Sequence, residues 1–88
     1  MSDATSSTVP PPATLTLDAR WLLCPLPVIR TQDRIAGLAD GTELEVLCTD
    51  PGALHDIPAW CRVHGHAYLG STRSGHEISV RVRVVRSK

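Results

Sequence analysis

The sequence predicts an α/β protein of the α+β kind, a two-layer sandwich with the order βαβαββ. Four segments alternate polar and apolar residues as half-buried strands do: residues 14–18, 42–49, 68–73 and 76–85. After each of the first two, apolar residues recur at the three- and four-residue spacing of a helix. We therefore expect a four-stranded mixed sheet with two helices on one face.

The chain has 88 residues, enough for one small domain. Residues 1–13 are rich in Ser, Thr and Pro and lack apolar periodicity, so they are predicted to be a disordered tail, the alternative being a proline ligand for a partner. Residues 14–88 are predicted to form the domain. Leu15 and Leu17 begin its first strand, which leads to a turn at Cys24.

Residues 25–39 predict the first helix. Its apolar side consists of Val28, Thr31, Ile35, Leu38 and Ala39. Arg30 and Arg34 fall opposite and form a basic stripe that begins near Cys24, which is either an ordinary solvated face or a docking surface for an acidic partner. Asp40-Gly41 is expected to end this helix, because glycine tolerates positive φ.

The second helix is expected to open at Asp50-Pro51, which places a capping residue before proline. Pro58 should divide it into a turn and a main helix, with Asp56 as a second cap. Cys61 lies on its apolar stripe beside Trp60, so we expect it in the core.

The remaining strands predict a sheet with one buried and one exposed face. Cys48 falls on the apolar side of the second strand and is expected to be structural, and Ser74-Gly75 predicts a hairpin between the last two strands. The apolar side of the last strand consists of Ile78, Val80, Val82 and Val84. On the exposed side, charged residues of the second and last strands could pair: Glu43 and Glu45 with Arg81 and Arg83.

The candidate reactive residue is Cys24, at the mouth of the first helix. Pro25 suits the first helical position, which would make Cys24 the N-cap. The helix dipole would then lower the pKa of the thiol, and the thiolate attacks electrophilic sulfur. The alternative is an inert cysteine packed under the helix start. Pro27 stands where a dithiol motif would carry its second cysteine, so disulfide exchange within this site is not expected.

Large apolar residues surround this cysteine in the sequence. Leu22 is expected to fill the core, whereas Trp21, Leu23 and Leu26 would form an exposed docking surface. The alternative is that Trp21 folds back over the sheet edge. Both helices follow strands, so their N-termini should emerge at one edge of the sheet, where Cys24 would meet the Asp50-Pro51 turn.

Several segments occur together in this chain: Leu17-Asp18-Ala19-Arg20, Leu22, Cys24-Pro25-x-Pro27-Val28, Asp50-Pro51, and Asp56-Ile57-Pro58 followed by Trp60-Cys61. Together they resemble the TusA/SirA-type small sulfur-carrier proteins, over about residues 15 to 85. Two residues depart from that pattern. Trp21 stands where the family usually has glycine, and Leu23 stands where a polar or basic residue often precedes the cysteine.

The resemblance implies a sulfurtransferase activity in which Cys24 receives a persulfide and passes it on, without a cofactor. Pro25 and Pro27 would position the cysteine. The implied donor is a cysteine desulfurase or a rhodanese-type protein, and the implied acceptor is a DsrE-like protein with a reactive cysteine. Family members serve tRNA thiolation, molybdenum cofactor synthesis or sulfur oxidation, and the sequence leaves the choice open.

The composition limits the partners and the cellular compartment that we expect for the protein. Lys+Arg and Asp+Glu number 9 each, which disfavours direct binding to nucleic acid or to an anionic membrane. Three cysteines, an odd number, and the lack of a recognisable leader predict a reducing cytoplasm. No apolar run approaches the ~20 residues that span a bilayer. We expect a cytoplasmic monomer.

Two other functions compete with sulfur transfer. The first is a small metal-binding domain that uses Cys61, His64 and His66 with His55 or His76, although we expect no metal because Cys61 should face the core. The second is a regulatory binding module that docks on a partner without sulfur chemistry.

Overall fold

The computed structural model describes residues 14–86 as a four-stranded sheet with two helices. Its elements follow one another as β2 (Thr14–Ala19), α1 (Leu26–Ile35), β3 (Glu43–Cys48), α2 (Ala53–His64), β4 (Ala67–Ser74) and β5 (Glu77–Arg83). The strand order across the sheet is β2-β3-β5-β4. Strands β2 and β3 are parallel, and the other neighbours are antiparallel. The predicted fold class is confirmed; the predicted tail over residues 1–13 lies outside the described residues.

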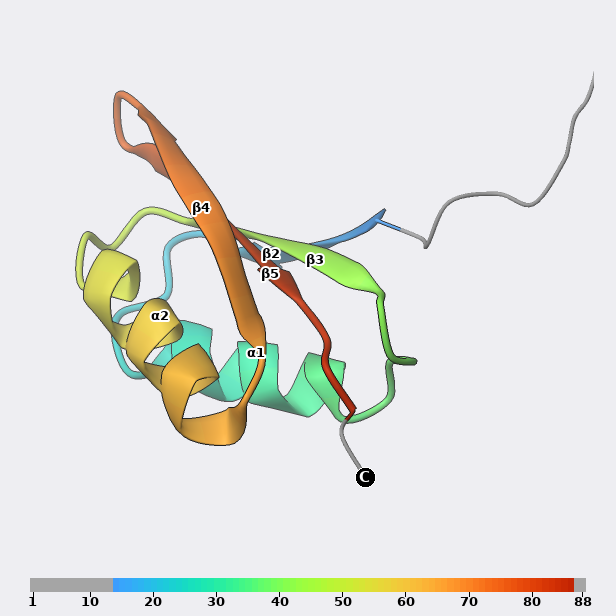
Figure 1. Ribbon diagram of the computed structural model, residues 1–88. Helices are drawn as coiled ribbons and strands as arrows, with labels where there is room; N and C mark the ends of the chain where they lie inside the picture. The colour runs from blue at the N-terminus through green and yellow to red at the C-terminus, as the bar shows by residue number, and fades with distance from the viewer. Residues whose placement is uncertain (1–13, 87–88) are drawn as a thin grey trace, which may run out of the picture.

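Both helices cover the same face of the sheet (Figure 1). The core between the two layers contains the inward side chains of β3 and β5, all with no exposed surface: Leu44, Val46, Cys48, Ile78, Val80 and Val82. Ile35 of α1 and Ile57 and Cys61 of α2 pack onto them. The alternation in the sequence therefore identified the buried face of the sheet correctly.

The opposite face of the sheet is polar. Arg83 pairs with Glu43 at 3.0 Å, as the sequence suggested. Glu45 lies opposite Arg81 in the strand register, but its carboxylate accepts a hydrogen bond of 2.6 Å from the Ser79 hydroxyl. These polar contacts satisfy the charged side chains of β3 without a ligand.

The first helix is shorter than its apolar pattern predicts. It ends at Ile35, so the expected end at Asp40-Gly41 is wrong, and Ala39 is exposed beyond the helix. The side chain of Arg86 caps this end, since it donates hydrogen bonds to the backbone carbonyls of Ile35 and Leu38. Carbonyl groups at a helix end need such donors, and here they come from a residue far along the chain.

The second helix is continuous from Ala53 to His64, with Pro58 inside it. The predicted break at Pro58 and the second cap at Asp56 are therefore both wrong. Packing explains the continuity, since Ile57 and Cys61 on either side of Pro58 are 0% and 1% exposed and fix both halves of the helix onto the sheet. Gly65 ends the helix in the left-handed conformation, with φ of 81°.

Candidate functional site

Cys24 lies in the turn between β2 and α1, beside the turn that precedes α2. Its backbone N–H donates to Oδ2 of Asp50 at 2.7 Å, and Oδ1 of the same carboxylate accepts from the N–H of Gly52 at 3.0 Å. Asp50 thus ties the two turns together. The structure confirms that Cys24 and Asp50-Pro51 share one edge of the sheet.

The predicted N-cap position of Cys24 is wrong. Pro25, which follows a cis peptide bond, occupies the N-cap of α1, and no side chain caps this helix. Pro27 lies in the first turn and is buried. The Cys24 sulfur lies instead against the start of α2, because a Cβ added to Gly52 would come within 3.0 Å of it. The thiol therefore rests on the first turn of the second helix.

The environment of Cys24 raises the pKa of its thiol to about 12, so the predicted lowering is also wrong. The largest cause is desolvation, followed by hydrogen bonding of the thiol to the Asp56 and Asp50 carboxylates. Hydrogen bonds from the N–H groups of Cys24 and Gly52 lower the pKa of Asp50, so this carboxylate is charged. The free protein at neutral pH therefore holds Cys24 as a thiol.

The other two cysteines are core residues, as predicted. Cys48 is 0% exposed and Cys61 is 1% exposed, and burial raises the pKa of each thiol to about 11. Cys24 is partly accessible. Cys24 is therefore the cysteine that a partner can reach.

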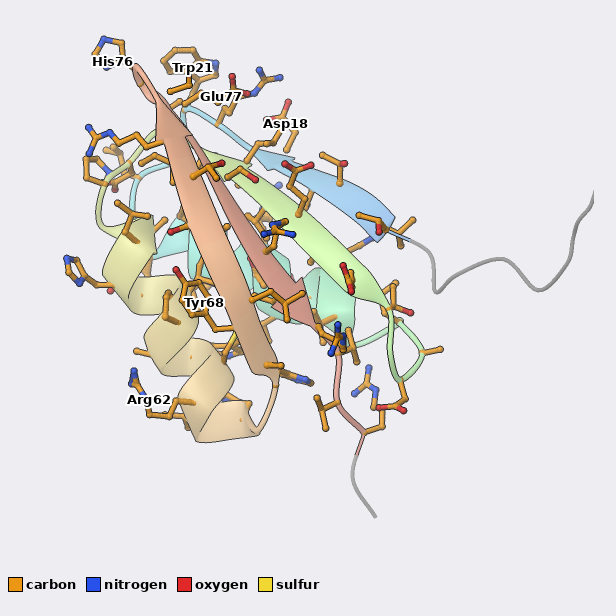
Figure 2. All side chains as sticks on the ribbon, turned by 45° about the horizontal axis from the view of Figure 1, so that its top comes forward. Asp18, Trp21, Arg62, Tyr68, His76 and Glu77 are labelled. Atoms are coloured by element: carbon orange, nitrogen blue, oxygen red, sulfur yellow. The ribbon has the colours of Figure 1, made fainter. Side chains whose placement is uncertain are left out.

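Three exposed apolar side chains flank Cys24 in the sequence and form what we call the apolar rim: Trp21, Leu23 and Leu26, which are 79%, 72% and 41% exposed. The interpretation that Trp21 folds back over the sheet edge is therefore wrong, whereas Leu22 packs against the core as expected. Figure 2 shows Trp21 at the end of the molecule where the β4–β5 hairpin turns, and the neighbouring Arg20 pairs with Glu77 of that hairpin. Arg30 and Arg34 are exposed on α1.

Trp21 has an unusual backbone conformation. Its φ is 69°, in the left-handed region that favours glycine. Its N–H donates to the Thr49 hydroxyl at 2.8 Å, which holds the turn in place. This conformation was not predicted from the sequence; the available signal was the glycine that the family usually carries at this position.

The histidines proposed for a metal site make other contacts. The rings of His64 and His66 pack against Trp60, with centroid distances of 4.8 and 5.2 Å, while Cys61 is buried. Within residues 14–86, no group of three or more His, Cys, Asp or Glu side chains is arranged to hold a metal ion. Cys61, His64 and His66 thus lie near one another without forming such a group.

A hollow of about 270 Å³ lies between α2 and β4, lined by Pro58, Cys61, Arg62, His66 and Tyr68. Figure 2 shows Arg62 and Tyr68 well away from Trp21.

No helix in the described part of the chain is long and apolar enough to cross a membrane.

The fold and the site together define a small two-layer βαβαββ domain that presents one partly accessible cysteine at a Cys-Pro-x-Pro turn. The family model described as "Sulfurtransferase TusA" matches residues 15–84. The chain therefore belongs to the TusA family of sulfur carriers.

Individual relatives agree with this assignment. The sulfur carrier protein TusA of Pseudomonas entomophila is 46% identical over 55 residues, which are 62% of this chain and 69% of that protein. TusA of Allochromatium vinosum is 36% identical over 59 residues, 67% of this chain and 78% of that protein. YrkF of Bacillus subtilis is 43% identical over 63 residues, 72% of this chain but 34% of YrkF, so the chain corresponds to about a third of that longer protein.

A solved structure shows the same fold. The SirA-like protein of Desulfitobacterium hafniense superposes with a TM-score of 0.67 at 25% identity, covering 82% of this chain and 99% of that chain.

Proposed function

We propose that this protein accepts sulfane sulfur as a persulfide on Cys24 and passes it to a cysteine of an acceptor protein. The observation that carries the proposal is the contrast among the three cysteines. Cys24 is partly accessible in the Cys-Pro-x-Pro turn, whereas Cys48 and Cys61 are buried in the core.

The loading step exchanges one sulfur–sulfur bond for another. The Cys24 sulfur attacks the outer sulfur of a donor persulfide, a new bond forms between these two sulfurs, and the donor's sulfur–sulfur bond breaks. The donor sulfur leaves as a thiolate and takes up the proton that Cys24 releases, so Cys24–SH and R–S–SH become Cys24–S–SH and R–SH. No cofactor enters this balance.

The partners follow from the same proposal. The donor would be a cysteine desulfurase or a rhodanese-type protein, the acceptor a DsrE-like protein, and the compartment the cytoplasm. The apolar rim is the proposed contact surface, with Arg30 and Arg34 beside it, and Pro25 and Pro27 would position the thiol. These features suit tRNA thiolation, molybdenum cofactor synthesis and sulfur oxidation alike.

Intact mass spectrometry tests the loading step. After incubation with a cysteine desulfurase and cysteine, or with a rhodanese and a sulfane donor, the protein should gain about 32 Da, one sulfur atom. Cys24→Ser should abolish the gain, because serine cannot form a persulfide. Cys48→Ala and Cys61→Ala are the matched controls and should keep it. Equal loading of all three variants would exclude Cys24 as the carrier, and partner binding without loading by any donor would indicate a binding module.

A further inference from the structure

Two carboxylates act on the Cys24 thiol, and the described residues supply no cation to balance them. The Asp50 carboxylate accepts a hydrogen bond of 2.7 Å from the Cys24 N–H, and a Cβ added to Gly52 would lie 3.0 Å from the Cys24 sulfur and 3.5 Å from Oδ1 of Asp50. The charges of Asp50 and Asp56 both raise the pKa of the thiol. Within residues 14–86, basic side chains pair with Asp18, Glu43 and Glu77, and none pairs with Asp50 or Asp56. The site therefore carries unneutralised negative charge at the sulfur that must react.

This charge affects both partners of the reaction. The carboxylates keep the thiol protonated, and the thiolate is the form that attacks sulfur. They also repel an anion that approaches the thiol, with an energy that grows as water leaves the contact. A positive group that arrives with the donor would remove both obstacles, because it would pair with the carboxylates and stabilise the thiolate.

The surface around Cys24 indicates a protein as the source of that charge. The apolar rim exposes Trp21, Leu23 and Leu26, which lie within three residues of Cys24 in the chain, and exposed apolar area of this kind favours a protein contact over binding of a small ion. A partner that covers the rim would also exclude water and strengthen the pairing of its cation with Asp50 and Asp56.

We infer that Cys24 takes sulfur from a protein donor that carries a lysine or arginine beside its transferable sulfur, and that the site disfavours anionic donors such as thiosulfate or hydropolysulfide. This inference rests on the proposed function, since it specifies the donor for the same cysteine. The bond changes are those of the loading step, and the donor's cation pairs with Asp50 and Asp56 while the Cys24 proton leaves with the donor thiol.

Small disulfides of known charge test the inference without sulfur transfer. The full chain is treated at low salt with cystamine, a dication, with neutral hydroxyethyl disulfide, and with dithiodipropionate, a dianion. Intact mass gives the rate of mixed-disulfide formation, and peptide mapping assigns it to Cys24. Each rate is divided by that of a neutral cysteine peptide, which removes the intrinsic reactivity of the disulfide. The corrected rate with cystamine should exceed that with dithiodipropionate by about tenfold, and added salt should shrink this ratio.

The variants locate the charge that causes the preference. Asp56→Asn or Asp50→Asn should reduce the ratio, whereas Asp33→Asn, which makes the same change in net charge at an exposed site of α1, should leave it unchanged. The salt series on the unmodified chain remains decisive if either variant fails to fold. A corrected ratio near one, or a ratio insensitive to salt and to both variants, overturns the inference. These reagents transfer no persulfide sulfur, so loss of the charge preference would leave the proposed carrier function standing. Conversely, failure of Cys24 to load sulfur, with the charge preference still present, would refute only the carrier function.

Discussion

Replacing Trp21 tests separately what this residue contributes to partner affinity and what its strained backbone costs in folding free energy. The left-handed conformation of this residue costs an L-amino acid about 1–2 kcal/mol. Glycine removes that cost but returns about 0.4–1 kcal/mol of chain entropy to the unfolded state. Trp21→Gly should therefore gain about 0.5–1 kcal/mol in folding free energy from the backbone.

The indole contributes little to the fold, because Trp21 is 79% exposed. The covered fifth of its surface, about 50 Å², stabilises the fold by about 1 kcal/mol. The two effects of Trp21→Gly nearly cancel, so the melting temperature should change by no more than about 5 °C. Trp21→Ala loses the same contact and keeps the strained backbone, so it should be about 0.5–1 kcal/mol less stable than Trp21→Gly.

Urea denaturation of both variants measures these free energies, and partner affinity is measured on the same samples. Both variants should bind the sulfur donor more weakly, by about 2 kcal/mol for a buried aromatic anchor. Alanine proving more stable than glycine at this position would refute the strain. A loss above about 2 kcal/mol of stability in both variants, with affinity unchanged, would show that the indole belongs to the fold.

Two further predictions concern the thiol and the core. Folding raises the pKa of the Cys24 thiol from its ordinary value of 9.0 to about 12. Alkylation of Cys24 by iodoacetamide at pH 8 should therefore be slower than in the urea-unfolded chain. By linkage, the stability from this proton is complete below pH 9 and is lost as pH rises toward 12. Urea melts of the unmodified chain and of Cys24→Ser across that range isolate this contribution from those of Cys48 and Cys61, and identical pH profiles would contradict the raised pKa of Cys24. Ile57→Ala should lower the free energy of unfolding by about 2–5 kcal/mol, because Ile57 is fully buried. The control Val63→Ala, at a residue 78% exposed on the same helix, should change it by no more than about 0.5 kcal/mol. Equal losses in urea denaturation would mean that the inner face of α2 is misassigned.

The sequence alone determined the order of the elements, the buried face of the sheet and the family. These features depend on short-range patterns, because strand alternation and helical spacing are set by neighbouring residues. The burial of Cys48 and Cys61 followed from the same patterns. The motif around Cys24 was equally visible, since its residues are adjacent in the chain.

The tertiary structure decided the chemistry of the site. The carboxylate of Asp50, in the turn before α2, reaches Cys24 across 26 positions of the chain, and Asp56 comes from α2 itself. The residues adjacent to Cys24 in the sequence predict a lowered pKa through the helix dipole. In the folded protein, the packed neighbours desolvate the thiol and raise its pKa. Likewise, Arg86 hydrogen-bonds the carbonyl of Leu38 just after α1 from 48 positions further along the chain. Electrostatic environments depend on which distant segments pack together, and no short stretch of sequence contains that information.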